Sequence, residues 1–235
     1  MVGHLGLRRG TIYNPHGNLL LAVILLVLLA VESLLLAGVV SLAFLDVGLS
    51  PFATSLILLG TFIGGFINIP LLRIESRVPI VTEEYVRFLG IMYKIPQLEF
   101  EQTTTTVAIN VGGALMPTLV SIYLIAKSSS TMIWALVGST VVAVIVHSTA
   151  RPVRGIGIVT PVFIPPLAAA AIAYILPTEA TKVVAYVSGT LGTLIGADLA
   201  NLHEIPRLGA PLVSIGGAGT YDGIFLTGIL AILLT

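Results

Sequence analysis

Two aspartates stand out because they lie in apolar runs, where ionisable side chains are rare. Asp198 and Asp222 each fall in a C-terminal segment of apolar and small residues that is long enough to enter a bilayer. An ionisable side chain inside a membrane helix costs roughly 2.5–3.5 kcal/mol at mid-helix, so its presence indicates a function or a buried partner. Two adjacent carboxylates share a proton, because like charges repel in a low dielectric. One then activates water as a general base and the other protonates a substrate oxygen, which is aspartyl hydrolysis without metal or cofactor.

Other polar residues fall in the same part of the expected bundle. Asn68, Asn110 and His147 lie in the cytoplasmic third of their segments when depth is counted at about 1.5 Å per helical residue. Asn201 follows Asp198 by three residues and therefore shares its helix face. We expect these residues to support the aspartate pair in one polar pocket open toward the cytoplasm. The alternative is that each aspartate has a separate structural or transport role.

Three further polar features have competing interpretations. Glu32 lies about 20 Å into the first apolar run, near the midplane of a bilayer, and it favours a transporter or channel for a small solute or ion. His203 and Glu204 could suggest a metal site, but they are not part of an HExxH motif and no second histidine lies close in sequence. We therefore interpret them as a solvated helix end and predict no metal. Arg151 and Arg154 are expected to reach the headgroups, or to hold a lipid phosphate in a non-catalytic lipid-binding or scaffold protein.

Small residues recur at spacings that allow close packing of the last two helices. Gly192 and Gly196 form one GxxxG motif, and Gly219 and Gly223 form another. Such motifs let helix backbones approach closely, so we expect them to bring the two aspartates together, although packing alone would also explain them. The run Gly216–Gly219 weakens a helix, which favours a helix that starts only shortly before the second aspartate.

The composition indicates a membrane protein. Hydrophobic residues make up 56% of the 235 residues and charged residues only 9%, with a mean hydropathy of +1.06. A soluble domain carries about 25% charged residues, and a fold of this size could not bury so much apolar surface. Eleven basic residues balance eleven acidic ones, which argues against a nucleic-acid partner. The absence of cysteine excludes disulfides and thiolate chemistry.

Counting apolar runs of about 20 residues predicts an all-α membrane protein, a polytopic bundle of about seven transmembrane helices. Arg8 and Arg9 precede the first run as in a signal peptide, but that run is too long for one, so we expect a retained helix. We treat residues 1–235 as a single transmembrane domain. The expected spans are 19–45, 51–72, 105–126, 130–148, 159–177, 183–200 and 211–234.

The distribution of Lys and Arg sets the expected orientation. With the N-terminus in the cytoplasm and the C-terminus outside, nine of the eleven basic residues lie on the inner side and two on the outer side. The polar stretch 73–104 is then a cytoplasmic insertion. Its β-branched and aromatic residues favour a β-hairpin with a turn near Gly90 over an interfacial helix. Membrane lipids and a transmembrane protein or peptide substrate are the expected partners in a cell membrane.

Five segments together resemble a known family. They are Asn68–Leu71, Asn110–Pro117, His147–Ile158, Ser188–Leu202 and Ser214–Ala231. The set resembles a prokaryotic membrane family catalogued as domain of unknown function 1614, over nearly the whole chain after the first span. This resemblance implies an architecture more than an activity.

A weaker resemblance is to the intramembrane aspartyl proteases of the presenilin and signal-peptide-peptidase group. Tyr221 and Asp222 look like the YD motif of those enzymes, and Gly196–Asp198 looks like a shortened GxGD motif. The order of the two motifs is reversed here, and Gly209–Leu212 is at most a scrambled counterpart of the Pro-Ala-Leu element. The resemblance implies that the aspartates are catalytic, that Tyr221 belongs to the site, and that the substrates span the membrane.

Overall fold

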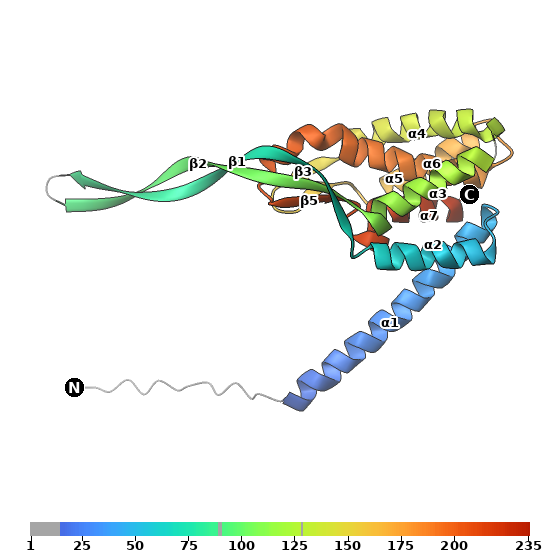
Figure 1. The fold of residues 1–235 in the computed structure, drawn as a ribbon, viewed down its shortest axis with the longest axis horizontal. Coiled ribbons are helices and arrows are strands. Elements are labelled where there is room, and N and C mark those ends of the chain that lie inside the picture. The colour runs from blue at the N-terminus through green and yellow to red at the C-terminus, as the bar shows by residue number, and fades with distance from the viewer. Residues whose placement is uncertain (1–14, 89–90, 128) are drawn as a thin grey trace. The chain divides into compact units, whose positions relative to one another are not determined.

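The computed structural model describes residues 15–88, 91–127 and 129–235. Within them the chain is mostly helical, and one α-helix lies in each of the seven expected segments (Figure 1). The helices are α1 (Pro15–Asp46), α2 (Pro51–Gly64), α3 (Met116–Lys127), α4 (Ser129–Thr149), α5 (Ile164–Ile175), α6 (Thr181–Thr193) and α7 (Gly223–Leu233).

Three helical stretches of the described chain are long and apolar enough to cross a membrane: Leu19–Asp46, Ser130–Thr149 and Thr181–Arg207. The other apolar helices have 10–17 residues. A helix needs about 20 residues to cross a bilayer alone. The described chain therefore has three candidate spans of full length and four shorter apolar helices.

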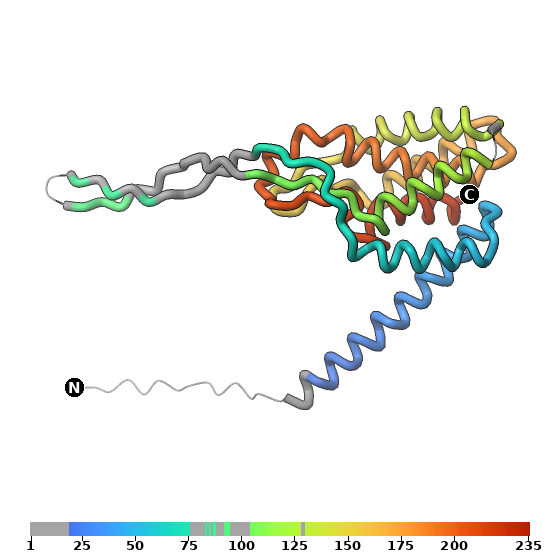
Figure 2. The backbone as a smooth tube through the Cα atoms, viewed as in Figure 1, coloured from blue at the N-terminus to red at the C-terminus, as the bar shows by residue number. Residues whose placement is uncertain are grey.

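The expected all-α class is incomplete, because the described chain also contains strands. They are β1 (Asn68–Phe88), β2 (Ile91–Asn110), β3 (Arg151–Val153), β4 (Gly157–Val159) and β5 (Leu212–Ile215). β1 pairs antiparallel with β2, β2 pairs parallel with β5, and β3 pairs antiparallel with β4. In the backbone trace, the segment that contains β5 lies beside the base of the β1–β2 hairpin (Figure 2).

The expected hairpin is confirmed, and it is longer than the stretch 73–104. Its register pairs Asn68 with Asn110 and continues to Phe88 and Ile91. The turn expected near Gly90 lies outside the described residues. The longer hairpin shortens the neighbouring helices, so the expected spans 51–72 and 105–126 are wrong at their hairpin ends. Four consecutive threonines, Thr103–Thr106, favour a strand because β-branched side chains fit a pleated sheet better than a helix.

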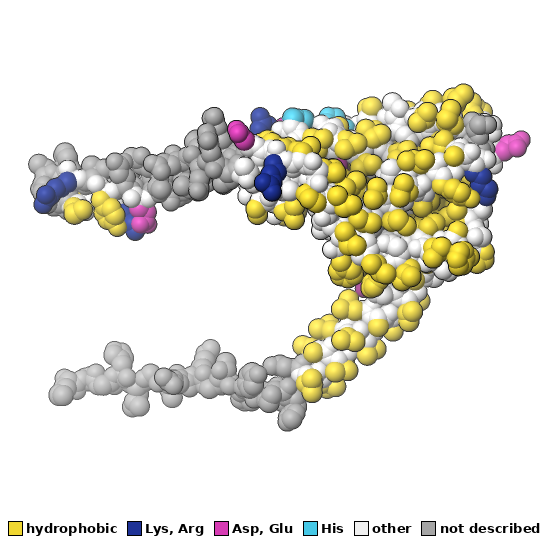
Figure 3. Space-filling model, in the orientation of Figure 1, with side chains coloured by type: hydrophobic (Ala, Val, Ile, Leu, Met, Phe, Trp, Pro, Cys, Tyr) yellow, Lys and Arg dark blue, Asp and Glu magenta, His cyan; other side chains and the backbone are white. Residues whose placement is uncertain are grey.

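Contacts divide the chain into two units, Met1–Val40 and Ser41–Thr235. In the first unit, the described side chains of α1 from Leu19 to Leu35 are exposed and almost all apolar, and Glu32 is exposed among them. A helix that is apolar on every side is typical of a membrane span. Apolar side chains also cover much of the visible face of the helices in the second unit (Figure 3).

Helix α6 is the centre of the second unit. It packs against α3, α4, α5 and α7, and its residues Val184–Val187 are fully buried. The ring of Tyr186 meets Phe44 edge to face, with ring centroids 5.8 Å apart. Because α6 is fixed on four sides, the segment that continues from its C-terminal end has a defined position, and that segment carries Asp198.

Candidate functional site

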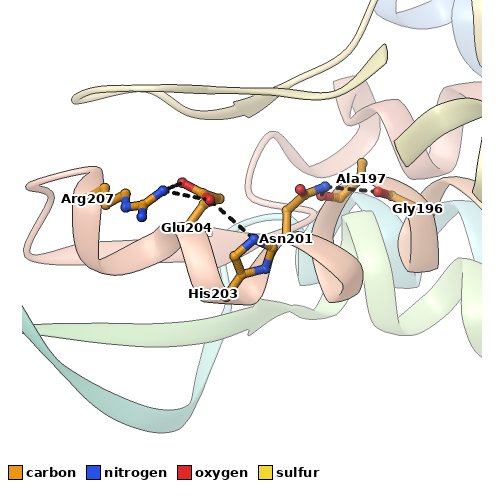
Figure 4. A network of polar contacts seen from close by, with 6 residues as sticks. All are labelled: Gly196, Ala197, Asn201, His203, Glu204 and Arg207. Carbon is orange, nitrogen blue, oxygen red and sulfur yellow. Dashed lines mark hydrogen bonds and ion pairs between the residues drawn. The ribbon is translucent and has the colours of Figure 1, made fainter. Parts of the chain in front are cut away.

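Asp198 lies where the helical run of α6 changes character. After Thr193 the backbone forms a π-helical turn, Leu194–Asp198, and then a 3₁₀ segment, Leu199–Arg207. The Nδ2 group of Asn201, which is 6% exposed, donates to the carbonyl oxygens of Gly196 at 3.0 Å and Ala197 at 2.8 Å (Figure 4). These bonds satisfy carbonyls at the irregular turn, so Asn201 supports the backbone that carries Asp198.

Asp222 lies immediately before α7 and caps it. Its Oδ1 accepts a hydrogen bond of 2.9 Å from the backbone N–H of Ile224, and its Oδ2 accepts one of 3.4 Å from the N–H of Ala218. The helix does not begin at Pro211 because Gly216 and Gly219 have φ of 72° and 61°, a conformation that favours glycine. The late start expected from the glycine run is therefore confirmed.

The two aspartates line the same two cavities. The smaller, of about 260 Å³, lies among α6, α7 and the segment after β4, and the larger, of about 370 Å³, is bounded by β5 and the residues around it. Both cavities share Asp198, Asp222 and Ile158 in their walls. The fold therefore brings together the two residues that sequence reasoning placed at the centre of the site.

The environments of the two carboxyl groups differ. Both aspartates are partly buried, and Asp222 accepts two backbone hydrogen bonds. The carboxyl group of Asp198 forms no hydrogen bond with any residue that the structure describes. Asp222 is thus held in one orientation by the backbone, whereas Asp198 can bond to water or to a ligand in the cavity.

Hydroxyl groups in the smaller cavity were missed by sequence reasoning. Thr160, Thr193 and Thr227 line it beside the aspartates. Thr193 is only 2% exposed, and its Oγ1 has no hydrogen-bond partner within the described chain. A buried polar group without a partner needs an explanation, such as a water or a ligand. One weak signal for Thr193 was present in the sequence: it is a polar residue in an apolar run, five positions before Asp198.

The expected supporting residues Asn68 and Asn110 bond to each other and to Ser214. Asn68 Oδ1 accepts hydrogen bonds from Asn110 Nδ2 at 3.1 Å and from Ser214 Oγ at 2.5 Å. Asn110 is fully buried and also bonds to the backbone of Gly65 and Gly113. Ser214 lines the larger cavity, but neither asparagine lines either cavity. The asparagines therefore fix the base of the hairpin against one wall of the site.

The other expected supporting residues have different positions. His147 is exposed at the end of α4 and lines neither cavity. Asn201 bonds to backbone carbonyls, as described above. Tyr221 is 49% exposed and lines the smaller cavity with the aspartates. Of the supporting residues, the structure thus places only Tyr221 in a cavity wall with the pair.

The first GxxxG motif packs α6 against α4, whereas sequence reasoning expected α7. A Cβ atom on Gly192 would lie 2.6 Å from a methyl group of Val142, and one on Gly196 would overlap the Ala143 carbonyl oxygen. The close approach expected from the motif is present, but with a different partner. Close contact between α6 and α7 instead occurs at Gly189, where a Cβ atom would lie 3.0 Å from a methyl group of Thr227, and at Gly228, where one would overlap Thr190.

The second GxxxG motif does not act as a packing face. Gly219 lies before α7 and approaches Gly65, since a Cβ atom there would be 3.1 Å from the Gly65 Cα. Gly223 has no such neighbour within 4 Å. The motif fails because its first glycine belongs to a separate 3₁₀ turn, Gly219–Tyr221, so the two glycines do not share a helix face.

His203 and Glu204 belong to a polar network at the end of the 3₁₀ segment. Both carboxylate oxygens of Glu204 accept hydrogen bonds of 2.9 Å from Nη1 of Arg207, and His203 Nε2 lies 3.2 Å from Glu204 Oε1 (Figure 4). The described residues contain no group of three or more His, Cys, Asp or Glu that could hold a metal ion. This network matches the interpretation of a helix end.

Comparison with known proteins gives one match. A family model with the description "Protein of unknown function (DUF1614)" matches residues 62–234. No curated protein and no solved structure matches the chain. The matched region includes the hairpin, both aspartates and all helices from α3 to α7. The resemblance to intramembrane aspartyl proteases gains no support from these comparisons.

Proposed function

The chain belongs to the DUF1614 family, whose description states no activity, and we propose from the site that it is a membrane-embedded aspartyl hydrolase. The observation that carries the proposal is that Asp198 and Asp222, from two separate segments, line the same two cavities. Two carboxyl groups in a cavity that admits water are the minimum that metal-free hydrolysis requires.

The hydrogen bonds suggest a role for each aspartate. Backbone N–H groups stabilise a carboxylate relative to a carboxylic acid, so we assign the ionised role to Asp222 and the protonated role to Asp198. Asp222 removes a proton from water as the water oxygen attacks the substrate carbonyl carbon. Asp198 gives its proton to the carbonyl oxygen, which forms a neutral diol.

The second half of the reaction restores the pair. As the C–N bond breaks, Asp222 gives its proton to the leaving nitrogen, and Asp198 takes a proton from one diol hydroxyl. The products are a carboxylic acid and an amine, and the pair again holds one proton. We place Thr193 as a positioning residue. Its hydroxyl is buried without a partner in the described chain, at the wall of the smaller cavity, and in this proposal it bonds to the attacking water only when substrate is bound.

The proposed substrates are membrane-spanning peptides. Asp198 lies in Thr181–Arg207, one of the stretches long enough to cross a bilayer, so we place the pair at a depth that a membrane-spanning peptide also occupies. In this proposal all seven helices cross the membrane, the shorter ones together with the segments that adjoin them. The N-terminus is cytoplasmic, as the distribution of Lys and Arg favours.

The test is peptide cleavage by the full-length protein in proteoliposomes, with a fluorogenic transmembrane peptide as the probe. Asp198→Asn and Asp222→Asn should each abolish cleavage without a change in the thermal unfolding midpoint large enough to indicate misfolding. Asp46→Asn is the matched control, since Asp46 pairs with Lys182 away from the cavities and its loss should leave cleavage intact. Full cleavage activity in Asp198→Asn or in Asp222→Asn would refute a catalytic role for the aspartate pair.

A second candidate, transport of a small solute or ion, is favoured by the break in the helical run at Leu194–Asp198. Discontinuous helices form the substrate sites of many transporters. A flux through proteoliposomes that is lost in Glu32→Gln, in a protein without hydrolytic activity, would select this function instead.

A further inference from the structure

A separate cavity lies at the opposite end of α6 from the aspartates. It has a volume of about 450 Å³ and is formed by the start of α4 and the residues that lead into α6. Its described walls are Ser130, Thr131, Trp134 and Pro177–Ala180. The hydrolase proposal uses none of these residues, so the cavity needs its own explanation.

The cavity carries one negative charge that the described protein does not neutralise. Glu179 is the only charged residue among its described walls, and it forms no ion pair with any described residue. The nearest basic residue in sequence, Lys182, is already paired, because its Nζ lies 2.6 Å from Asp46 Oδ2. A cationic ligand would therefore find an available carboxylate here.

Trp134 gives the same cavity an aromatic wall. It is partly buried and packs against the apolar core around Val184, which holds its ring in place. Tryptophan has the aromatic face that attracts cations most strongly, and quaternary ammonium groups are typical ligands of such faces. A metal ion, in contrast, would need several oxygen ligands, and this cavity offers a single carboxylate. An indole and a carboxylate together select an organic ammonium.

The position of the cavity indicates the source of that ammonium. Two of the three candidate spans, Ser130–Thr149 and Thr181–Arg207, begin at its walls. The ends of spanning helices lie at the level of the lipid headgroups, where tryptophan is enriched. We propose that this cavity binds the ammonium headgroup of a zwitterionic phospholipid between Trp134 and Glu179. The inference does not depend on hydrolysis.

Trp134 also supplies the assay, because it is the only tryptophan in the chain. Choline chloride is added to the full-length protein in a maltoside detergent, at ionic strength held constant with sodium chloride, and tryptophan emission is recorded. Choline should change the emission with half-saturation at roughly 10 mM, as weak cation–π and exposed ionic contacts allow. The neutral isostere 3,3-dimethylbutanol should give no saturable change.

Variants distinguish an ammonium-binding site from a cavity that binds small ligands by apolar contact alone. Glu179→Gln should weaken choline binding by about three- to fivefold, the effect of an exposed charge pair. Glu204→Gln, at the other end of the helical run, should leave it unchanged. Equal responses to choline and dimethylbutanol, or equal affinity in Glu179→Gln, overturn the proposal.

Nanodiscs distinguish a lipid headgroup from a free ammonium solute. In phosphatidylcholine discs the headgroup should already occupy the cavity, so added choline should have little effect on emission. In phosphatidylglycerol discs, which offer no ammonium, choline should act as it does in detergent. The same choline response in both discs would refute the lipid as the ligand. Cleavage activity enters none of these readouts, so the hydrolase proposal and this one fail separately.

Discussion

Replacing Thr193 by valine should stabilise the protein and impair its chemistry. Valine has nearly the shape of threonine, and Thr193 Oγ1 is buried without a partner in the described chain. Burying an unpaired hydroxyl costs about 1–3 kcal/mol, so its removal should raise the free energy of unfolding by roughly 1 kcal/mol. For a chain of this size, that corresponds to an increase of about 2–4 °C in the thermal unfolding midpoint.

The same hydroxyl is proposed to bind the attacking water, so Thr193→Val should lower the rate of cleavage while it raises stability. Loss of one hydrogen bond to the attacking water is worth about 0.5–1.5 kcal/mol, which predicts a decrease in kcat/KM of roughly two- to tenfold. Thr193→Ser, which keeps the hydroxyl, should retain most of the activity.

Thr61→Val is the matched control for both effects. Thr61 is fully buried in α2, its Oγ1 also lacks a partner among described residues, and it lines neither cavity. It should raise the unfolding midpoint without reducing cleavage. Unfolding in maltoside detergent and cleavage in proteoliposomes measure the two quantities. Unchanged cleavage in Thr193→Val, or the same loss in Thr61→Val, would refute the assignment of the water-binding hydroxyl.

Two further substitutions test the structure that carries the aspartates. Asn201→Ala removes the donor to two carbonyl oxygens, so it should lower the free energy of unfolding by about 1–3 kcal/mol, measured as a lower unfolding midpoint. Gly196→Ala should cost about 1–3 kcal/mol or more, because the new Cβ overlaps the Ala143 carbonyl, whereas Gly223→Ala has open space and should leave the midpoint unchanged or raised. An unchanged midpoint in Asn201→Ala or Gly196→Ala contradicts the packing described.

The sequence was sufficient for features that depend on local chemistry. Apolar runs located all seven helices, β-branched residues indicated the hairpin, and the glycines of Gly216–Gly219 indicated a late start for α7. Each of these signals acts over a few residues, so it can be read without knowing the fold. The ends of α2 and α3 were wrong because the hairpin register, set by pairing Asn68 with Asn110, extends into the apolar segments.

Features that depend on which elements meet could not be predicted in the same way. The Gly192 face was expected against α7 and lies against α4, because a small-residue face specifies close packing but no partner. His147 was assigned to the pocket by depth alone, and depth says nothing about direction around the helix axis. Thr193 was missed because an unpaired hydroxyl is a property of the packed interior.

The positions of the aspartates explain how two acids are tolerated beside apolar helices. The cost of an ionisable group is greatest in the middle of a regular helix surrounded by lipid. Asp198 instead ends a π-helical turn, and Asp222 caps a helix that starts after an unwound segment. Both breaks expose the carboxyl groups to cavities, where water or substrate can solvate them, and the backbone N–H groups of Ile224 and Ala218 donate to Asp222. The irregular backbone that lowers the cost of the charges thus also creates the space in which they can act, and a change that made either segment a continuous helix should remove both.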